Sequence, residues 1–250
     1  MNKFAHILDI EIPRDTKISS ASSSTKKIKK DSIFFGLQGS KIHGSSFAQE
    51  ALNLGASIVV HNDENLKTKN QNIFYVENLE NKIIDFLNAL YEIDINSNNF
   101  FTFTGTNGKT SAAYLCHQLL INMGYDSIYI GTLGTQYKNK EFNNSFSSKT
   151  TPDIFELFEI INSLNRGLDS VSICIEISSH ALDQKRLNNI YSFNSASILN
   201  ISNDHLDYHK NISTYIKTKF DIFKINSPVK LINEESNKLR DHKYDLTCVS

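Results

Sequence analysis

The sequence has little net charge and no long apolar run, and each absence excludes a class of protein. Its 250 residues hold 26 Lys and Arg against 27 Asp and Glu, a formal net charge of −1, so the overall charge gives no reason to expect nucleic acid as a partner. No apolar run approaches the roughly 20 residues of a membrane span, and the N-terminal MNKFAHILDIEIPRD reaches acidic residues too early for a secretory signal. We therefore expect a cytoplasmic monomer that engages neither nucleic acid nor membrane.

Cysteines are few, and no two of them form a C-x-x-C pair. Cys116, Cys174 and Cys248 lie far apart along the chain, which argues against a zinc site and against a disulfide framework. Cys116 and Cys174 fall on apolar faces, so we expect both to be small core residues.

The stretch FTFTGTNGKTSAAYL, residues 101–115, lacks the first glycine of a Walker A motif, because Phe103 stands where that glycine would be. The other parts of a phosphate-binding loop are present. An apolar strand-like run leads into a tight loop, Lys109 can reach the β- and γ-phosphates, Thr110 can ligate Mg²⁺, and a helix follows. An ordinary strand-to-helix turn is the alternative, since Gly and Asn favour positive φ, and the loop alone does not decide between the two.

Strand-like and helix-like runs alternate along the chain, which predicts an α/β protein with mainly parallel sheets covered by helices. In the first series, strand-like runs occupy 32–37, 56–61 and 72–77, and helix-like runs occupy 45–55 and 81–91. The polar, Asn-rich EIDINSNNF then reads as a linker. Because the chain exceeds the common domain size of roughly 100–150 residues, we expect two domains, an N-terminal α/β domain over 1–93 and a P-loop-type ATPase domain over 99–250.

The second series begins with the phosphate-loop strand. The helix after the loop carries apolar residues at helical spacing and ends near a glycine: Ala112, Leu115, Cys116, Leu119, Leu120 and Gly124. Strand-like runs follow at SIYIG, SVSICIEIS, SASILNI and VKLIN, and TPDIFELFEIINSL supplies Pro and Asp at a helix start.

Polar residues follow two of these strands, at the place where open α/β sheets bind ligands. Glu176 stands near the end of one strand, before Ser178, Ser179 and His180, and the next strand is followed by Asp204, His205, Asp207 and His209. Two such clusters beside a phosphate loop favour a functional site. Taken singly, the histidines could instead cap helices or bind backbone, and Asp207 could be an N-cap.

With these stretches in this order, the sequence resembles the Mur ligase family, and within it the branch that makes the UDP-N-acetylmuramoyl-tripeptide. The matching stretches are TGTNGKT (104–110), GTLGT (131–135), TTPD (150–153), EISSHALDQKRL (176–187), NDHLDYH (203–209) and YIKTKFDIF (215–223). TGTNGKT is shared with other ATP-dependent amide ligases, including folylpolyglutamate synthetases, whereas TTPD followed by SSHAL and DHLDYH is more specific to the tripeptide branch. KKDSIFFGLQG and ALNLGASIVV extend the resemblance to the N-terminal part.

The resemblance implies an ATP-dependent ligase of peptidoglycan precursor synthesis that uses Mg²⁺. ATP would phosphorylate the free D-Glu carboxylate of UDP-MurNAc-L-Ala-D-Glu, and the amine of diaminopimelate or lysine would displace the phosphate. The implied roles are ATP binding by Gly105, Thr106, Asn107, Gly108, Lys109, Thr110 and Ser111; metal binding by Thr110, Glu176 and His205; substrate binding by Thr25, Thr150, Thr151, Ser178, Gln184 and Arg186; and catalysis by Lys109, Glu176, His205 and Lys219, the last as a carbamylated lysine.

Some positions depart from the family's pattern. Ser24, Thr25 and Lys26 stand where the family has a D-S-R that contacts uridine, and His43 precedes Gly44 where the family has D-G. The chain ends at Ser250, which we interpret as a ligase truncated within its ATPase domain, without the domain that binds the incoming amino acid. A non-catalytic nucleotide or UDP-sugar binding remnant and a folylpolyglutamate-synthetase-like ligase remain the alternatives.

Overall fold

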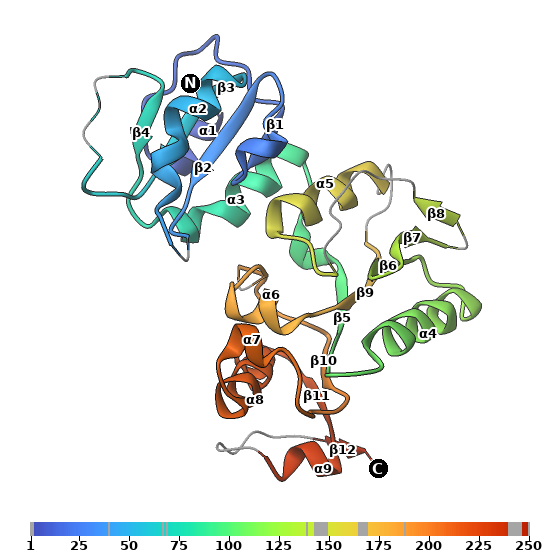
Figure 1. Ribbon diagram of the computed structural model, residues 1–250. Helices are drawn as coiled ribbons and strands as arrows, with labels where there is room; N and C mark the ends of the chain where they lie inside the picture. The colour runs from blue at the N-terminus through green and yellow to red at the C-terminus, as the bar shows by residue number, and fades with distance from the viewer. Residues whose placement is uncertain are drawn as a thin grey trace. The chain divides into compact units, whose positions relative to one another are not determined.

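The computed structural model describes residues 3–39, 41–66, 68, 70–138, 140–142, 150–164, 170–187, 189–239 and 247–249. The chain divides into two compact units, Met1–Ile95 and Asn96–Ser250 (Figure 1). Their boundary falls within the Asn-rich stretch that the sequence marks as a linker, where the short 3-10 helix η3 spans Ile95–Ser97. Within the described part of the chain, no helix is long and apolar enough to cross a membrane.

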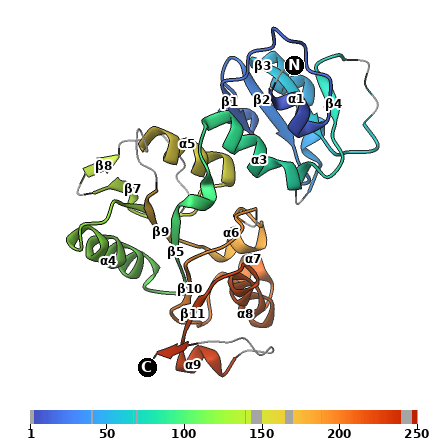
Figure 2. The ribbon, with the colours of Figure 1, turned by 180° about the vertical axis from the view of Figure 1, so that it is seen from behind.

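The first unit is a four-stranded parallel sheet with helices, in the strand order β1-β2-β3-β4. Its elements are α1 (Lys3–Leu8), β1 (Ser20–Ser22), η1 (Thr25–Lys27), β2 (Ser32–Gly36), η2 (Gly44–Phe47), α2 (Ala48–Asn53), β3 (Ala56–His61), β4 (Ile73–Tyr75) and α3 (Leu79–Tyr91) (Figures 1 and 2). The predicted strand 56–61 is confirmed to the residue, because its β-branched run suits a buried central strand.

Aromatic rings and small residues fill the core of this unit. Phe86 of α3 packs against Phe4 of α1 and Phe35 of β2, with ring centroids 4.9 and 5.3 Å away. A second cluster joins Phe34 and Val59 of the sheet to alanines of α2. Strand β1 was not predicted, because its serines lack the apolar signal of a strand; Ser20 is instead held by a 2.8 Å hydrogen bond between its hydroxyl and that of Ser32.

The second unit contains an eight-stranded sheet in the order β12-β11-β10-β5-β9-β6-β7-β8. The strands are β5 (Asn99–Thr104), β6 (Ser127–Gly131), β7 (Gly134–Tyr137), β8 (Lys140–Phe142), β9 (Ser172–Glu176), β10 (Ser195–Ile198), β11 (Val229–Asn233) and β12 (Thr247–Val249). From β12 to β6 the neighbours are parallel, and β7 and β8 pair antiparallel at one edge. The predicted α/β class with mainly parallel sheets is confirmed, and the β7–β8 hairpin is an addition to it.

The helices of this unit are α4 (Lys109–Asn122), α5 (Ile154–Leu164), α6 (Ser179–Asp183), α7 (Leu206–His209), α8 (Ile212–Phe220), η4 (Asp221–Lys224) and α9 (Glu234–Asn237). Strand β5 lies between β9 and β10, with Phe103 opposite Glu176 and Thr104 opposite Ile198. The carboxyl ends of these three strands therefore meet at one edge of the sheet, where the loops that follow them are brought together.

In helix α4 the spacing of apolar residues predicts the wrong buried face. The spacing of Leu115 and Leu119 indicates a core-facing stripe, but their exposed fractions are 65% and 59%. The fully buried residues are Ala113 and His117, whose imidazole makes hydrogen bonds of 2.9 Å to the Ser127 hydroxyl and 3.0 Å to the Lys138 carbonyl. A histidine with both ring nitrogens hydrogen-bonded can be buried. His117, and not Leu115 or Leu119, therefore lies on the buried face of α4.

The two cysteines expected in the core differ. Cys174 of β9 is fully buried, which confirms the prediction, whereas Cys116 of α4 is only partly buried.

Candidate functional site

A cavity of about 530 Å³ opens at the carboxyl ends of β5 and β9. Its walls come from the loop before α4, the ends of these strands and helix α8. It is lined by Gly105, Thr106, Asn107, Gly108, Lys109, Thr110, Ser111, Thr132, Thr150, Glu176, Ser178, Ser179, His180, Arg186, His205, Tyr215 and Lys219. The structure thus brings together the whole predicted phosphate loop, Glu176, His205, Lys219 and three of the six residues expected to bind substrate.

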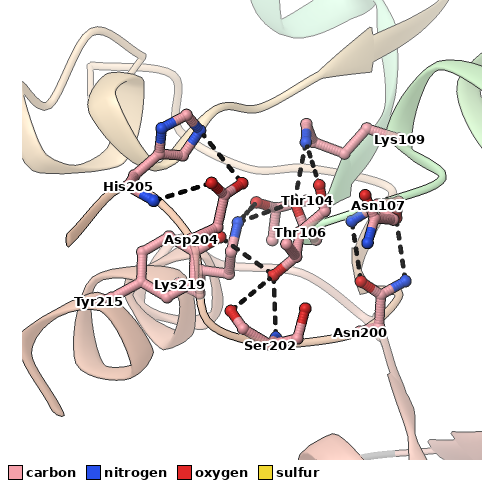
Figure 3. A network of polar contacts seen from close by, with 11 residues as sticks. Thr104, Thr106, Asn107, Lys109, Asn200, Ser202, Asp204, His205, Tyr215 and Lys219 are labelled. Carbon is pink, nitrogen blue, oxygen red and sulfur yellow. Dashed lines mark hydrogen bonds and ion pairs between the residues drawn. The ribbon is translucent and has the colours of Figure 1, made fainter. Parts of the chain in front are cut away.

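The loop is held in place by the segment that follows β10 (Figure 3). The amide N–H of Asn107 donates to the side chain of Asn200, whose own amide donates back to the Asn107 carbonyl, both at 2.9 Å. The Thr106 hydroxyl donates to the Ser202 carbonyl at 3.2 Å and accepts from the Ser202 N–H at 3.0 Å. The loop follows β5 and the segment follows β10, and these two strands are neighbours in one sheet. These bonds therefore fix the loop before any ligand binds. Gly108 has φ of +81°, a conformation that favours glycine, just before α4 begins.

Two lysines reach the same carbonyl oxygen of this loop (Figure 3). Lys109 Nζ donates to Gly105 O at 2.9 Å and to Thr106 O at 3.0 Å. Lys219 Nζ, from α8, donates to Gly105 O at 2.9 Å and lies 4.8 Å from the centre of the Tyr215 ring. By contrast, Lys217 on the same helix is exposed. Two lysine amino groups at one wall of a cavity form a site where a bound anion would stabilise their protonated forms.

Burial and mutual repulsion set the protonation of these lysines. Lys219 is 1% exposed. Burial first, and the neighbouring Lys109 second, lower the pKa of Lys219 to about 7, while Asp204 opposes the shift. Burial also lowers the pKa of Lys109, against the attraction of Glu176 and Asp204. A large fraction of Lys219 is therefore a neutral amine, and so a nucleophile, at neutral pH.

Glu176 ends β9 as a completely buried carboxylate. Its Oε1 accepts from the Tyr129 hydroxyl at 2.5 Å and from the Thr132 amide at 2.8 Å. Its Oε2 accepts from the hydroxyls of Thr110 at 3.0 Å and Thr132 at 3.1 Å. One oxygen is thus held by the protein interior, and the other is bonded to hydroxyls of residues that line the cavity.

His205 lies at the mouth of the cavity, among other rings. Its Nε2 is 3.5 Å from a carboxylate oxygen of Asp204, and its side chain is 47% exposed. His180 lies 5.2 Å from it between ring centroids and 4.0 Å from Tyr208, whose hydroxyl donates to Asp183 at 2.7 Å. Burial and the neighbouring His205 lower the pKa of His180. Both histidines therefore belong to one packed cluster beside the loop.

The oxygen atoms of Thr110 and Glu176 at this wall suit Mg²⁺, which prefers hard oxygen ligands; the imidazole of His205 is a less favoured ligand for it. The Thr110 hydroxyl donates a hydrogen bond of 3.0 Å to Glu176 Oε2, and His205 lines the same cavity. No three His, Cys, Asp or Glu side chains among the described residues converge into a preformed metal site. A metal here would need oxygens from a bound substrate to complete its coordination.

The residues expected to bind substrate fall into two groups. Thr150, Ser178 and Arg186 line the cavity. Thr151 and Gln184 instead hold Arg186: its Nη1 donates to Thr151 O at 2.7 Å, and its Nη2 donates to Gln184 Oε1 at 2.8 Å. These bonds orient the guanidinium at the cavity wall.

Thr25 lies in the other unit, in the 3-10 helix η1, where it is half-buried. His43, at the position of the expected D-G, accepts a hydrogen bond from the Ser45 N–H at 3.1 Å and lies 3.2 Å from Asn62 Oδ1.

Sequence reasoning missed Tyr129, Thr132 and Asn200. The run around Tyr129 carries only the signal of a strand, although a tyrosine buried there must find a partner for its hydroxyl. Asn200 carried no signal, because its role depends on β10 lying beside β5.

Two family models match this chain. A model of the Mur ligase middle domain matches residues 103–248, and a model described as the Mur ligase family, catalytic domain, matches residues 17–94. The UDP-N-acetylmuramoyl-L-alanyl-D-glutamate--2,6-diaminopimelate ligase of Wigglesworthia glossinidia brevipalpis is 35% identical over 229 residues, which cover 87% of this chain and 44% of the relative. The chain spans about half the length of the curated relatives it matches.

Solved structures agree on the fold. The structure of a UDP-N-acetylmuramoyl-L-alanyl-D-glutamate--2,6-diaminopimelate ligase gives a TM-score of 0.72 at 23% identity and covers 98% of this chain and 51% of that one. MurF ligase from Thermotoga maritima, solved in complex with ADP, gives a TM-score of 0.54 at 19% identity over 88% of this chain and 46% of that one.

Proposed function

This chain belongs to the Mur ligase family, and from that premise we propose that it forms the ATP-binding and carboxylate-activating part of a peptidoglycan precursor ligase. The proposed acceptor is UDP-MurNAc-L-Ala-D-Glu, and the proposed amino acid is diaminopimelate or lysine. The observation that carries the proposal is the meeting of the Lys109 and Lys219 amino groups with the buried Glu176 carboxylate at one cavity. Relatives whose names specify the diaminopimelate ligase activity support the choice of substrate.

The arrangement matches what acyl phosphate formation requires. A triphosphate and a substrate carboxylate repel each other, so the site must bring two anions together and neutralise them. The loop N–H groups and Lys109 would hold the phosphates of ATP, and Arg186 would offer its planar guanidinium to an anionic group of the acceptor. The loop's attachment to Asn200 and Ser202 keeps these donors in place, which reduces reorganisation when the charges meet.

Thr110, Glu176 and His205 would hold Mg²⁺, which when bound neutralises phosphate charge and orients the reacting oxygens. The phosphorylated carboxylate would then be open to attack by an amine. We assign to Lys219 the role of a carbamylated lysine: its neutral amine would form a bond to the carbon of CO₂ and release one proton, and the resulting carbamate would be an anion beside Lys109.

The first unit would bind the UDP-sugar part of the acceptor, with Thr25 among its contacts. The match of residues 17–94 to a Mur ligase domain supports this assignment. We further propose that the protein acts in the cytoplasm as a monomer.

The test is nucleotide binding to the chain as it stands. Replacing Lys109 by Ala removes the loop's own cation, so Mg·ATP affinity measured by calorimetry should fall at least about 10-fold, the cost of one charge-assisted hydrogen bond. Lys217→Ala is the matched control, because it removes an exposed lysine of α8 that does not line the cavity. Equal ATP affinity in wild type and Lys109→Ala would reject the phosphate-loop assignment.

A further inference from the structure

Tyr129 is a fully buried residue of β6 that has no part in the chemistry described above. Its ring packs edge-on against Tyr114, with centroids 5.6 Å apart. Its hydroxyl donates to Glu176 Oε1 at 2.5 Å. This buried hydroxyl can therefore influence the orientation of the Glu176 carboxylate.

The direction of this hydrogen bond follows from the neighbouring groups. The Leu133 N–H donates to the Tyr129 oxygen at 3.3 Å, so the phenol accepts from one side and has its single proton free for Glu176. The Thr132 amide donates to the same carboxylate oxygen at 2.8 Å. Oε1 is therefore held by two donors that belong to the protein, the Tyr129 hydroxyl and the Thr132 N–H.

Gly131, the last residue of β6, makes room for this pair. A Cβ on Gly131 would overlap Glu176 Oε1 and lie 2.5 Å from the Tyr129 hydroxyl oxygen. Since the backbone of Gly131 does not have a positive φ, the need for glycine here is one of space and not of conformation. The close approach of the strand to the carboxylate is thus built into the sequence Tyr-Ile-Gly-Thr.

We propose that Tyr129 is a positioning residue, whose hydroxyl and the Thr132 amide hold one oxygen of Glu176 so that the other faces the metal of the bound nucleotide. The inference rests on the proposed function, because it needs a metal at Thr110 and Glu176. A Glu carboxylate rotates easily about its last torsion. Fixing one oxygen removes that freedom before the metal arrives, and such supporting hydrogen bonds typically change metal affinity 10- to 100-fold.

The test measures metal binding and not turnover. Mn²⁺ is titrated into the full chain at saturating ATP, and free Mn²⁺ is followed by electron paramagnetic resonance. We expect Tyr129→Phe to weaken Mn²⁺ binding about 10-fold, with ATP affinity in the absence of metal unchanged. Tyr137→Phe is the matched control: the Tyr137 hydroxyl also donates to a carboxylate, that of Asp126 at 3.1 Å, but neither residue lines the cavity.

A second variant covers the case in which Tyr129→Phe does not fold. Gly131→Ala keeps the hydroxyl but places a methyl group in the space of Oε1, so it too should weaken Mn²⁺ binding while Tyr137→Phe binds as wild type does. Wild-type Mn²⁺ affinity in a folded Tyr129→Phe or Gly131→Ala protein overturns the inference and leaves the proposed function standing. Failure of the wild-type chain to bind Mn²⁺ with ATP overturns both.

Discussion

The two units of this protein are built alike but use the carboxyl ends of their strands differently. In the first unit, the polar residues that follow β2 and β3 bond to one another and to helix α3: the Ser45 hydroxyl donates to Asp63 at 2.6 Å, and the Asn62 amide donates to both oxygens of Glu80. In the second unit, Lys109 and Lys219 donate to loop oxygens. Within the described part of the chain, neither lysine makes an ion pair with a carboxylate.

In both units the parallel sheet provides the position for a site, and the side chains at that position determine whether a charged ligand can bind there. Where hydroxyl and amide donors occupy the carboxylate oxygens, few hydrogen-bonding positions are left for a ligand. Where two lysine amino groups share one carbonyl oxygen, their protonated forms repel each other, and a bound anion would relieve that repulsion. Substitutions at three positions test this difference between the units through the free energy of unfolding, and the one with the largest expected effect comes first.

The strongest test concerns the pH dependence of stability that Lys219 should impose. Below pH about 7 the lysine is protonated in the folded and unfolded chains alike. Between about 7 and its ordinary value of 10.5 only the unfolded chain is protonated. The unfolded state then binds more protons, so the free energy of unfolding should rise with pH through that window, by up to about 1.4 kcal/mol per pH unit.

Urea unfolding at a series of pH values measures this slope. In Lys219→Met the rise between pH 7 and 10 should be lost, whereas in Lys217→Met, which changes an exposed lysine of the same helix, it should remain. A slope that survives in Lys219→Met would mean that this amine is not the group responsible.

A smaller effect is expected from Glu176→Ala. The change leaves the buried Tyr129 hydroxyl without its acceptor, and an unsatisfied buried donor costs about 2 kcal/mol of unfolding free energy. Glu176→Gln keeps an acceptor oxygen and should lose less. Chemical denaturation at pH 6 measures both, and equal stability of wild type and Glu176→Ala would show that the hydrogen bonds to Glu176 contribute nothing to folding.

The smallest effect is expected from Asp63→Ala in the first unit. Asp63 accepts from the buried Ser45 hydroxyl and from the amide of exposed Asn65, and the second donor can turn to water. The loss of unfolding free energy should therefore be below that of Glu176→Ala, and Mg·ATP affinity should not change. A fall in ATP affinity comparable to that of Lys109→Ala would contradict the separation of roles between the units.

Most strands and helices could be predicted from the sequence because their signals are local. The runs that became β3, β6 and β11 match to the residue, since β-branched and aromatic residues between turn signals favour a strand. Helix α3 was expected from residue 81 and begins at Leu79. The elements missed had weak local signals, such as the serine-rich β1 and the short β7–β8 hairpin.

The α/β class, the glycine-containing loop with Lys109 and Thr110, and the polar residues at the ends of strands could be read from the sequence, because each depends on neighbours in the chain. Which of these groups meet depends on the packing of the folded chain. Lys219 reaches Gly105 across 114 positions, and Tyr129 reaches Glu176 across 47. Those contacts depend on β5 lying between β9 and β10 and β6 beside β9. Strand order is set by packing of the whole sheet, which no local pattern of residues encodes.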